Sequence, residues 1–80
     1  MVDVHLWSGL RQLAGDAVVV TVKAATAREM LAALQTAHPG LAPVIRGGVS
    51  VVVDGEMVTD LTAPIHPGAE IYLMQRIKGG

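Results

Sequence analysis

The chain has 80 residues, of which 51% are hydrophobic and 16% are charged, and six basic against seven acidic residues give a net charge of −1. This length predicts one small domain, and the composition excludes a disordered polyelectrolyte. The balanced charge excludes a general attraction to nucleic acid or to anionic membranes, so neither is an expected partner.

The N-terminal quarter of the sequence predicts a wide β-hairpin. Residues 2–7 alternate apolar and polar side chains with a period of two, which is typical of a half-buried strand. Residues 17–22 are rich in β-branched side chains and predict a second strand. The segment 10–14 between them is long enough for a helical turn.

A single main helix is predicted next. Thr26 and Glu29 have the spacing of a capping box, in which the threonine side chain caps the first turn. The sequence His38-Pro39-Gly40 is expected to end the helix, because the residue before a proline is pushed out of the helical region. A short further turn is expected at residues 41–45. The apolar positions that follow helical spacing are Ala27, Met30, Leu31, Leu34 and Ala37.

The second half of the sequence predicts three more strands. Residues 49–53 form a valine-rich strand, and the Asp54-Gly55 pair after it is a strong turn signal before a short strand at residues 56–58. In the loop that follows, Leu61 and Ile65 are expected to fill the core. The last strand is predicted from Glu70 to Arg76. The order β, β, α, β, β, β predicts an α+β fold with one mixed sheet.

Three stretches of this sequence together resemble the MoaD/ThiS family of ubiquitin-like sulfur carriers. They are Leu10-Arg11-Gln12-Leu13-Ala14-Gly15, the turn Pro67-Gly68-Ala69-Glu70-Ile71 and the pair Gly79-Gly80. The resemblance covers essentially the whole chain and is strongest to the small subunit of molybdopterin synthase. It implies a β-grasp fold of four to five strands with one main helix, in which the first and last strands are parallel neighbours. It also implies a folded domain at residues 1–76 and a flexible tail at 77–80.

The same resemblance implies a chemical role for Gly80. Its carboxyl group, with an ordinary pKa of about 3.3–3.7, is a carboxylate near neutrality and a poor electrophile. In the family an E1-like adenylyltransferase activates this group with ATP, and a sulfur donor then converts it to a thiocarboxylate. The thiocarboxylate delivers sulfur to an acceptor enzyme or large subunit, with molybdopterin synthase as the leading destination. The chain would therefore be a sulfur-carrying subunit or co-substrate rather than a catalyst by itself.

Residue chemistry agrees with this division of labour. The pair Gly47-Gly48 is not followed by a Lys-Ser/Thr pair, so the sequence has no Walker-type loop for phosphates and ATP is expected on the partner. The sequence has no cysteine, so no persulfide can form on this chain. We therefore expect no cofactor bound by the chain itself.

A carrier also needs a docking face, which strand alternation places on the last strand. If Ile71 and Leu73 point under the helix, then Tyr72, Met74 and Arg76 point to the open side of the sheet. Val52 on the neighbouring strand is expected to join them. The segment after the strand, Ile77, Lys78 and Gly79, is expected to enter the partner with Gly80, and Arg76 is the preferred candidate to guide it.

Two other functions stay open at this point. Residues 75–78 read Gln-Arg-Ile-Lys, without the prolines common before the end of molybdopterin-type carriers, and this basic approach is closer to that of ubiquitin-type modifiers. The chain could then be conjugated to proteins through Gly80, with Lys23 and Lys78 as its only lysines. The chain has nine glycines, so the pair Gly79-Gly80 could also occur by chance. The chain would then be a β-grasp interaction module whose C-terminal glycines have no role.

The remaining polar residues predict no further site. His5, His38 and His66 do not have the spacing of metal ligands, so no metal centre is expected. Asp54 is expected to bond the backbone of its turn, and Trp7 to pack on the outward face of the first strand. No signal-peptide pattern and no apolar run of about eighteen residues occurs, so a cytoplasmic protein is expected.

Overall fold

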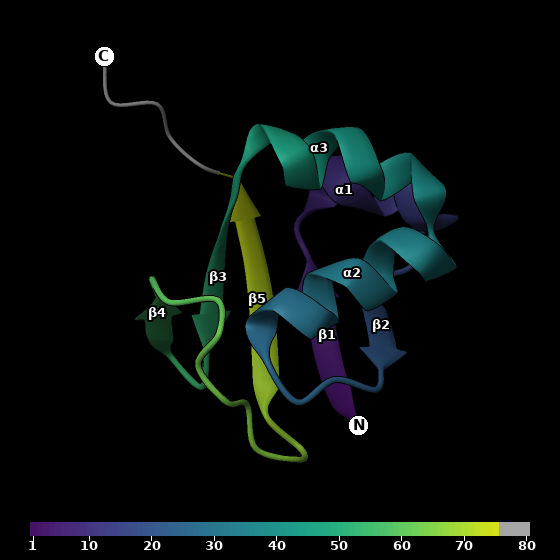
Figure 1. Cartoon of the computed structure of the whole chain (residues 1–80). Helices are drawn as coiled ribbons and strands as arrows, with labels where there is room; N and C mark the ends of the chain where they lie inside the picture. Colours follow the sequence, from purple (N-terminus) through teal and green to yellow (C-terminus); the bar gives the residue numbers. More distant parts are fainter. Residues whose placement is uncertain (76–80) are drawn as a thin grey trace.

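The computed structural model describes residues 1–75, which form one mixed sheet of five strands with helices packed on one face (Figure 1). The strands are β1 (Val2–Leu6), β2 (Val19–Val22), β3 (Val49–Val53), β4 (Glu56–Val58) and β5 (Glu70–Gln75). The helices are α1 (Ser8–Arg11), α2 (Ala27–Ala37) and α3 (Ala42–Gly47), with 3-10 turns at Gln12–Ala14 and Pro39–Leu41. The predicted order of the five strands and the main helix α2 is confirmed, and α1 and α3 are short helices at the places where helical turns were expected.

The sheet has the strand order β2-β1-β5-β3-β4, so β1 and β5 lie side by side in its centre. These two strands are parallel, with Val4 beside Ile71 and Leu6 beside Leu73. The pairs β1–β2, β3–β5 and β3–β4 are antiparallel. This arrangement confirms the expected α+β class and the β-grasp fold.

Helix α2 begins where the sequence predicts. Thr26 has extended backbone angles, and its side-chain oxygen accepts a hydrogen bond of 3.1 Å from the backbone N–H of Glu29. The helix ends before Pro39, also as predicted, but Ala37 is exposed rather than buried. Leu41, which follows in the 3-10 turn Pro39–Leu41, occupies the core instead.

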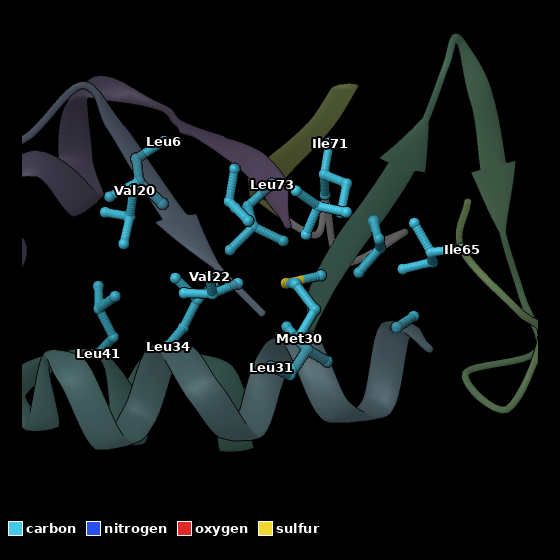
Figure 2. Close-up of a cluster of buried hydrophobic side chains, with 14 of the residues drawn as sticks. Leu6, Val20, Val22, Met30, Leu31, Leu34, Leu41, Ile65, Ile71 and Leu73 are labelled. Atoms are coloured by element: carbon cyan, nitrogen blue, oxygen red, sulfur yellow. The ribbon is translucent and has the colours of Figure 1, made fainter. Parts of the chain in front are cut away.

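The core lies between α2 and one face of the sheet. Met30, Leu31 and Leu34 point from the helix toward side chains of the central strands, among them Ile71 and Leu73 (Figure 2). Alternation along β1 puts Val2, Val4 and Leu6 on the same face. Among residues 1–75, no helix covers the opposite face of the sheet (Figure 1).

The loop between β4 and β5 contributes to the core through one of the two expected side chains. Ile65 is buried, and its backbone N–H donates a 2.7 Å hydrogen bond to the carbonyl oxygen of Ala25. Leu61 is 40% exposed, so the expectation that it fills the core is wrong. Its backbone carbonyl instead accepts a 2.9 Å hydrogen bond from the N–H of Arg28, which turns the Leu61 backbone toward the first turn of α2.

The turn between β3 and β4 is the two-residue hairpin turn that Asp54-Gly55 predicts. Both residues have positive φ angles, 50° for Asp54 and 86° for Gly55. Two consecutive positive φ angles characterise the type I′ turn, whose twist matches that of the flanking strands. No helix among residues 1–75 combines the length and apolar character needed to cross a bilayer.

Candidate functional site: the open face of the sheet

The exposed side chains of β5 mark the open face of the sheet. Ile71 and Leu73 are buried against the core, whereas Tyr72 is 42% exposed and Met74 is 52% exposed. Strand alternation alone produces this division, because successive side chains point to opposite faces. The predicted orientation of Tyr72 and Met74 is thus confirmed, and their binding role stays a prediction.

Strand register extends this face across the whole sheet. Tyr72 lies beside His5 on one side and beside Val52 on the other. The rings of His5 and Tyr72 are stacked, with centroids 4.5 Å apart and an angle of 13° between their planes. Val19 is the partner of His5 on β2, and Met57 is the partner of Val52 on β4. Paired residues in a sheet point to the same face, so these five form one row, which we call the central row.

A groove of about 360 Å³ runs along one side of the central row. Trp7, directly after β1, and Val18, directly before β2, contribute to its lining, and Arg11 of α1 supplies its cationic group. The guanidinium Nε of Arg11 donates a 3.2 Å hydrogen bond to the carbonyl oxygen of Leu6, which fixes the side chain beside the end of β1. The open face therefore offers an apolar groove with a positive charge at the end where β1 and β5 finish.

Sequence reasoning placed Val52, Tyr72 and Met74 on this face but missed His5, Arg11 and Val18 as parts of the groove. The signal for His5 was present, because it alternates with buried Val4 and Leu6. Arg11 gave no such signal, since its position depends on how α1 packs against the end of β1. Trp7 directly follows β1 and is partly buried against the core cluster, rather than packed only on the outward face of the strand as expected, and it also lines the groove.

A polar corner lies at the other end of β5. The carboxylate of Asp54 accepts a 3.0 Å hydrogen bond from the backbone N–H of Glu70, and its second oxygen pairs with Nε2 of His66. The Asp54 backbone N–H also donates to the carbonyl oxygen of Glu70, at 2.9 Å. Asp54 does bond the backbone, as expected, but it joins its turn to the start of β5, and the pairing with His66 was not predicted.

These contacts shift the pKa values of both groups. The backbone hydrogen bond from Glu70, followed by the bond from His66, lowers the pKa of Asp54 below its ordinary value. The hydrogen bond to the carbonyl of Pro67, at 2.9 Å from His66 Nδ1, is the main cause that raises the pKa of His66, with Asp54 as the second cause. Both ring nitrogens of His66 face oxygen acceptors, so the imidazolium form, which carries a proton on each nitrogen, can donate both hydrogen bonds.

The fold and the open face can be compared with known proteins. The sequence model of the ThiS family matches residues 4–80, nearly the whole chain. The chain belongs to the ThiS family. No curated protein sequence matches it.

Solved structures similar to this ThiS-family chain include a small archaeal modifier protein and chains from two protein complexes. SAMP1 from Haloferax volcanii is 29% identical, with 99% of this chain and 98% of that chain covered and a TM-score of 0.79. In the BexX/CysO complex of Amycolatopsis orientalis, the similar chain is 25% identical, with 100% of both chains covered and a TM-score of 0.84. A complex of subunits 1 and 2 of the molybdopterin-converting factor from Helicobacter pylori matches at 23% identity, covering 99% of this chain and 97% of that one, with a TM-score of 0.73, and supports the fold alone.

Five of the predicted site residues of this ThiS-family chain lie outside the described residues: Arg76, Ile77, Lys78, Gly79 and Gly80. The predicted boundary between a domain at 1–76 and a tail at 77–80 also falls there. Strand β5 is described to Gln75 and is the element that leads to these residues. Residues 1–75 contain no group of three or more histidine or acidic side chains arranged to hold a metal ion.

Proposed function

We propose that this ThiS-family chain is a sulfur carrier that works through the carboxyl group of Gly80. An E1-like adenylyltransferase joins this carboxylate to the AMP part of ATP and releases pyrophosphate. A sulfur donor then displaces AMP, leaving a C-terminal thiocarboxylate. The carrier delivers this sulfur to an acceptor enzyme in cofactor biosynthesis, with molybdopterin synthase as the leading candidate.

The observation that carries this proposal is the family match, which extends through Gly80. The open face adds support, because exposed Tyr72 and Met74 lie on β5, the last described strand before the proposed reacting residue in the sequence. Tyrosine and methionine suit surfaces that serve more than one partner, since one has an apolar body with a polar tip and the other an adaptable side chain. A carrier must meet an activating enzyme and an acceptor in turn.

The chemistry assigns separate tasks to chain and partner. The chain presents a carboxylate, which resists attack until the partner converts it to an acyl adenylate. The incoming sulfur then bonds to the acyl carbon, and AMP is the leaving group. In delivery, the thiocarboxylate sulfur first bonds to an electrophilic carbon of the acceptor enzyme's substrate, and water then cleaves the acyl C–S bond, which leaves the sulfur on the substrate and regenerates the carboxylate. On this proposal ATP and the catalytic groups belong to the partner, and the chain contributes the carboxyl group and the docking face.

Intact mass spectrometry tests the proposal. The chain is incubated with the E1-like adenylyltransferase of its own genome, ATP and a sulfide source, and its mass is recorded. Replacement of a terminal oxygen by sulfur adds about 16 Da. A chain lacking Gly80 is the matched control and should keep its original mass. An unchanged mass for the complete chain would contradict the carrier function.

A second candidate is a ubiquitin-like modifier that forms an amide with a protein amine through Gly80. The likeness to SAMP1, a small archaeal modifier protein, favours it, as does the basic, proline-free stretch 75–78. Expression of a tagged chain in its native host would then give tagged species larger by whole proteins, absent when Gly80 is deleted. A β-grasp interaction module predicts neither the mass increase nor the conjugates.

A further inference from the structure

The pair Asp54-Gly55 has a chemical reactivity that neither the hairpin turn nor the proposed function uses. An aspartyl side chain can react with the backbone nitrogen of the next residue and form a five-membered succinimide ring. A glycine in that next position favours the reaction, because it has no Cβ to hinder the approach of its nitrogen. The chain has no asparagine, and of its four aspartates only Asp54 precedes a glycine. The sequence therefore contains a single pair of this reactive kind.

The reaction rearranges the backbone in two balanced steps. The nitrogen of Gly55 bonds to Cγ of Asp54, and the carboxyl hydroxyl leaves with the amide proton as water. A water molecule then opens the ring. Attack of this water on Cγ restores aspartate, whereas attack on the main-chain carbonyl carbon gives isoaspartate, in which the backbone runs through the former side chain. Water has access to the turn, since both residues are exposed.

The structure anchors the Asp54 carboxyl group to neighbouring elements. One oxygen accepts the 3.0 Å hydrogen bond from the Glu70 N–H, and the other pairs with Nε2 of His66. These two residues belong to the start of β5 and to the loop before it, which lie at the same end of the sheet as the β3–β4 turn (Figure 1). Formation of the ring expels one of the two oxygens, so it must break at least one of these hydrogen bonds.

The same contacts keep the carboxyl group in its less reactive form. Only the protonated group has a hydroxyl to lose as water, and a carboxylate resists attack by nitrogen. The hydrogen bond from Glu70, followed by that from His66, lowers the pKa of Asp54, so the reactive acid form is rarer than in a free side chain. Geometry and charge therefore act in the same direction.

We propose that Asp54-Gly55 is a site of spontaneous isoaspartate formation, and that the contacts of Asp54 with His66 and the Glu70 backbone slow this reaction in the folded chain. Isoaspartate adds a carbon to the backbone of a two-residue turn in which both φ angles are positive. It also shortens the arm that carries the carboxyl group, so the contacts with Glu70 and His66 are lost. The modified chain should have a lower Tm. This inference does not depend on the proposed function.

The test compares His66→Ala with the unsubstituted chain and with the control His38→Ala. His38 follows α2 and is a histidine outside this cluster. Each folded protein is kept near neutral pH for several weeks, and peptide mapping measures the fraction of isoaspartate at residue 54, since the two forms give separate species of equal mass. We expect His66→Ala to form isoaspartate about fivefold faster or more, the factor for one lost hydrogen bond. The control should react at the unsubstituted rate.

Two further samples separate the local contact from a general loss of stability. Thr26→Ala weakens the cap of α2, far from Asp54 in the sequence, and its rate should stay close to that of the unsubstituted chain. The unsubstituted chain unfolded in guanidinium chloride has none of the contacts and should react faster than any folded sample. An unchanged rate in His66→Ala, or an equal rise in Thr26→Ala or His38→Ala, would overturn the protective role. Absence of isoaspartate at residue 54 in the unfolded chain would overturn the site itself.

Discussion

At the scale of single residues, His66 is held by two oxygen acceptors, and this gives the protein a pH-dependent contact. Its pKa is raised in the folded state, so its contribution to stability is fully present below about pH 6.5 and is lost as the pH rises through the raised value. The pKa of Asp54 is lowered, so its contribution is present above about pH 4 and is lost as the pH falls through the lowered value. The pair therefore stabilises the fold most between about pH 4 and 6.5.

We predict that His66→Ala lowers the Tm more at pH 5.5 than at pH 8.5. Thermal unfolding followed by circular dichroism at the two pH values measures this difference. The matched control repeats the substitution in an Asp54→Asn background, where the charge partner is absent and the pH dependence should shrink. A Tm loss that is the same at both pH values would show that the imidazolium contributes nothing.

Gly9 controls the position of Trp7 at the rim of the groove. A Cβ at this position would lie 2.7 Å from the indole Nε1, closer than such atoms approach, and 3.2 Å from Cδ1, which is tighter than most contacts of this kind. We predict that Gly9→Ala displaces the indole and changes the fluorescence emission of the single tryptophan. The steric conflict should cost about 1–3 kcal/mol, partly offset by the better helix propensity of alanine.

Gly47→Ala is the control for this substitution. Gly47 also lies in a short helix, α3, but a Cβ there would meet no atom within 4 Å. Its tryptophan emission should match that of the unsubstituted chain. An unchanged emission spectrum in Gly9→Ala would mean that the indole is not held by the absence of a side chain at Gly9.

At the scale of elements, helix α2 is capped at its N-terminus by Thr26 and contains a second threonine, Thr36, that does not cap it. Thr26 accepts a hydrogen bond from the Glu29 N–H at the start of the helix, whereas the Thr36 hydroxyl donates to the Ala32 carbonyl one turn before it. We predict that Thr26→Ala lowers the free energy of unfolding by about 1 kcal/mol, because the first turn loses its cap. Urea denaturation measures this loss.

Thr36→Ala makes the same chemical change in the same helix. The side chain is exposed, and alanine has the higher helix propensity. The free energy of unfolding should therefore stay constant or rise by about 0.3 kcal/mol. Equal losses in the two variants would assign the effect to β-branching rather than to capping.

The elements themselves were largely predictable from the sequence, whereas the partners of loop residues were not. Alternation in β1 and β5 and helical spacing in α2 each repeat over several residues, so single exceptions do not hide the pattern. Ile65 and Leu61 lie in a loop whose sequence has no such period. Whether each side chain is buried depends on which backbone groups of the loop bond to residues 25 and 28. The burial of Leu41 in place of Ala37 likewise follows from the path of the chain after Pro39.

At the scale of the whole molecule, the candidate site arises from the parallel pairing of the first and last strands. This pairing brings His5 onto Tyr72 and Asp3 beside Glu70, residues more than sixty positions apart in the chain. Alternation predicted the face of each residue, but only the register determines which residues are neighbours. The exposure of Tyr72 and Met74 on β5 was thus predictable, whereas the pairing of Asp3 with Glu70 and the groove required the assembled sheet.

The two faces of β5 separate stability from partner binding, which adjacent substitutions can test. Leu73 is 1% exposed and Met74 is 52% exposed. We predict that Leu73→Gln lowers the free energy of unfolding by about 2–5 kcal/mol, because it removes core contacts and buries an amide. This loss is a large fraction of the total stability of a small domain. Met74→Gln should change the free energy of unfolding by no more than about 0.5 kcal/mol.

Of these two variants, only Met74→Gln can report on partner binding, because it is expected to stay folded. On the proposed function, Met74→Gln should weaken binding to the adenylyltransferase about fivefold or more, because an apolar contact in the groove of the proposed docking face is lost while the fold persists. Circular dichroism and calorimetry on one preparation give both quantities. A Met74→Gln protein that is folded and binds with unchanged affinity would remove this side chain from the docking face, and the partner would then have to meet the chain through other residues of the open face.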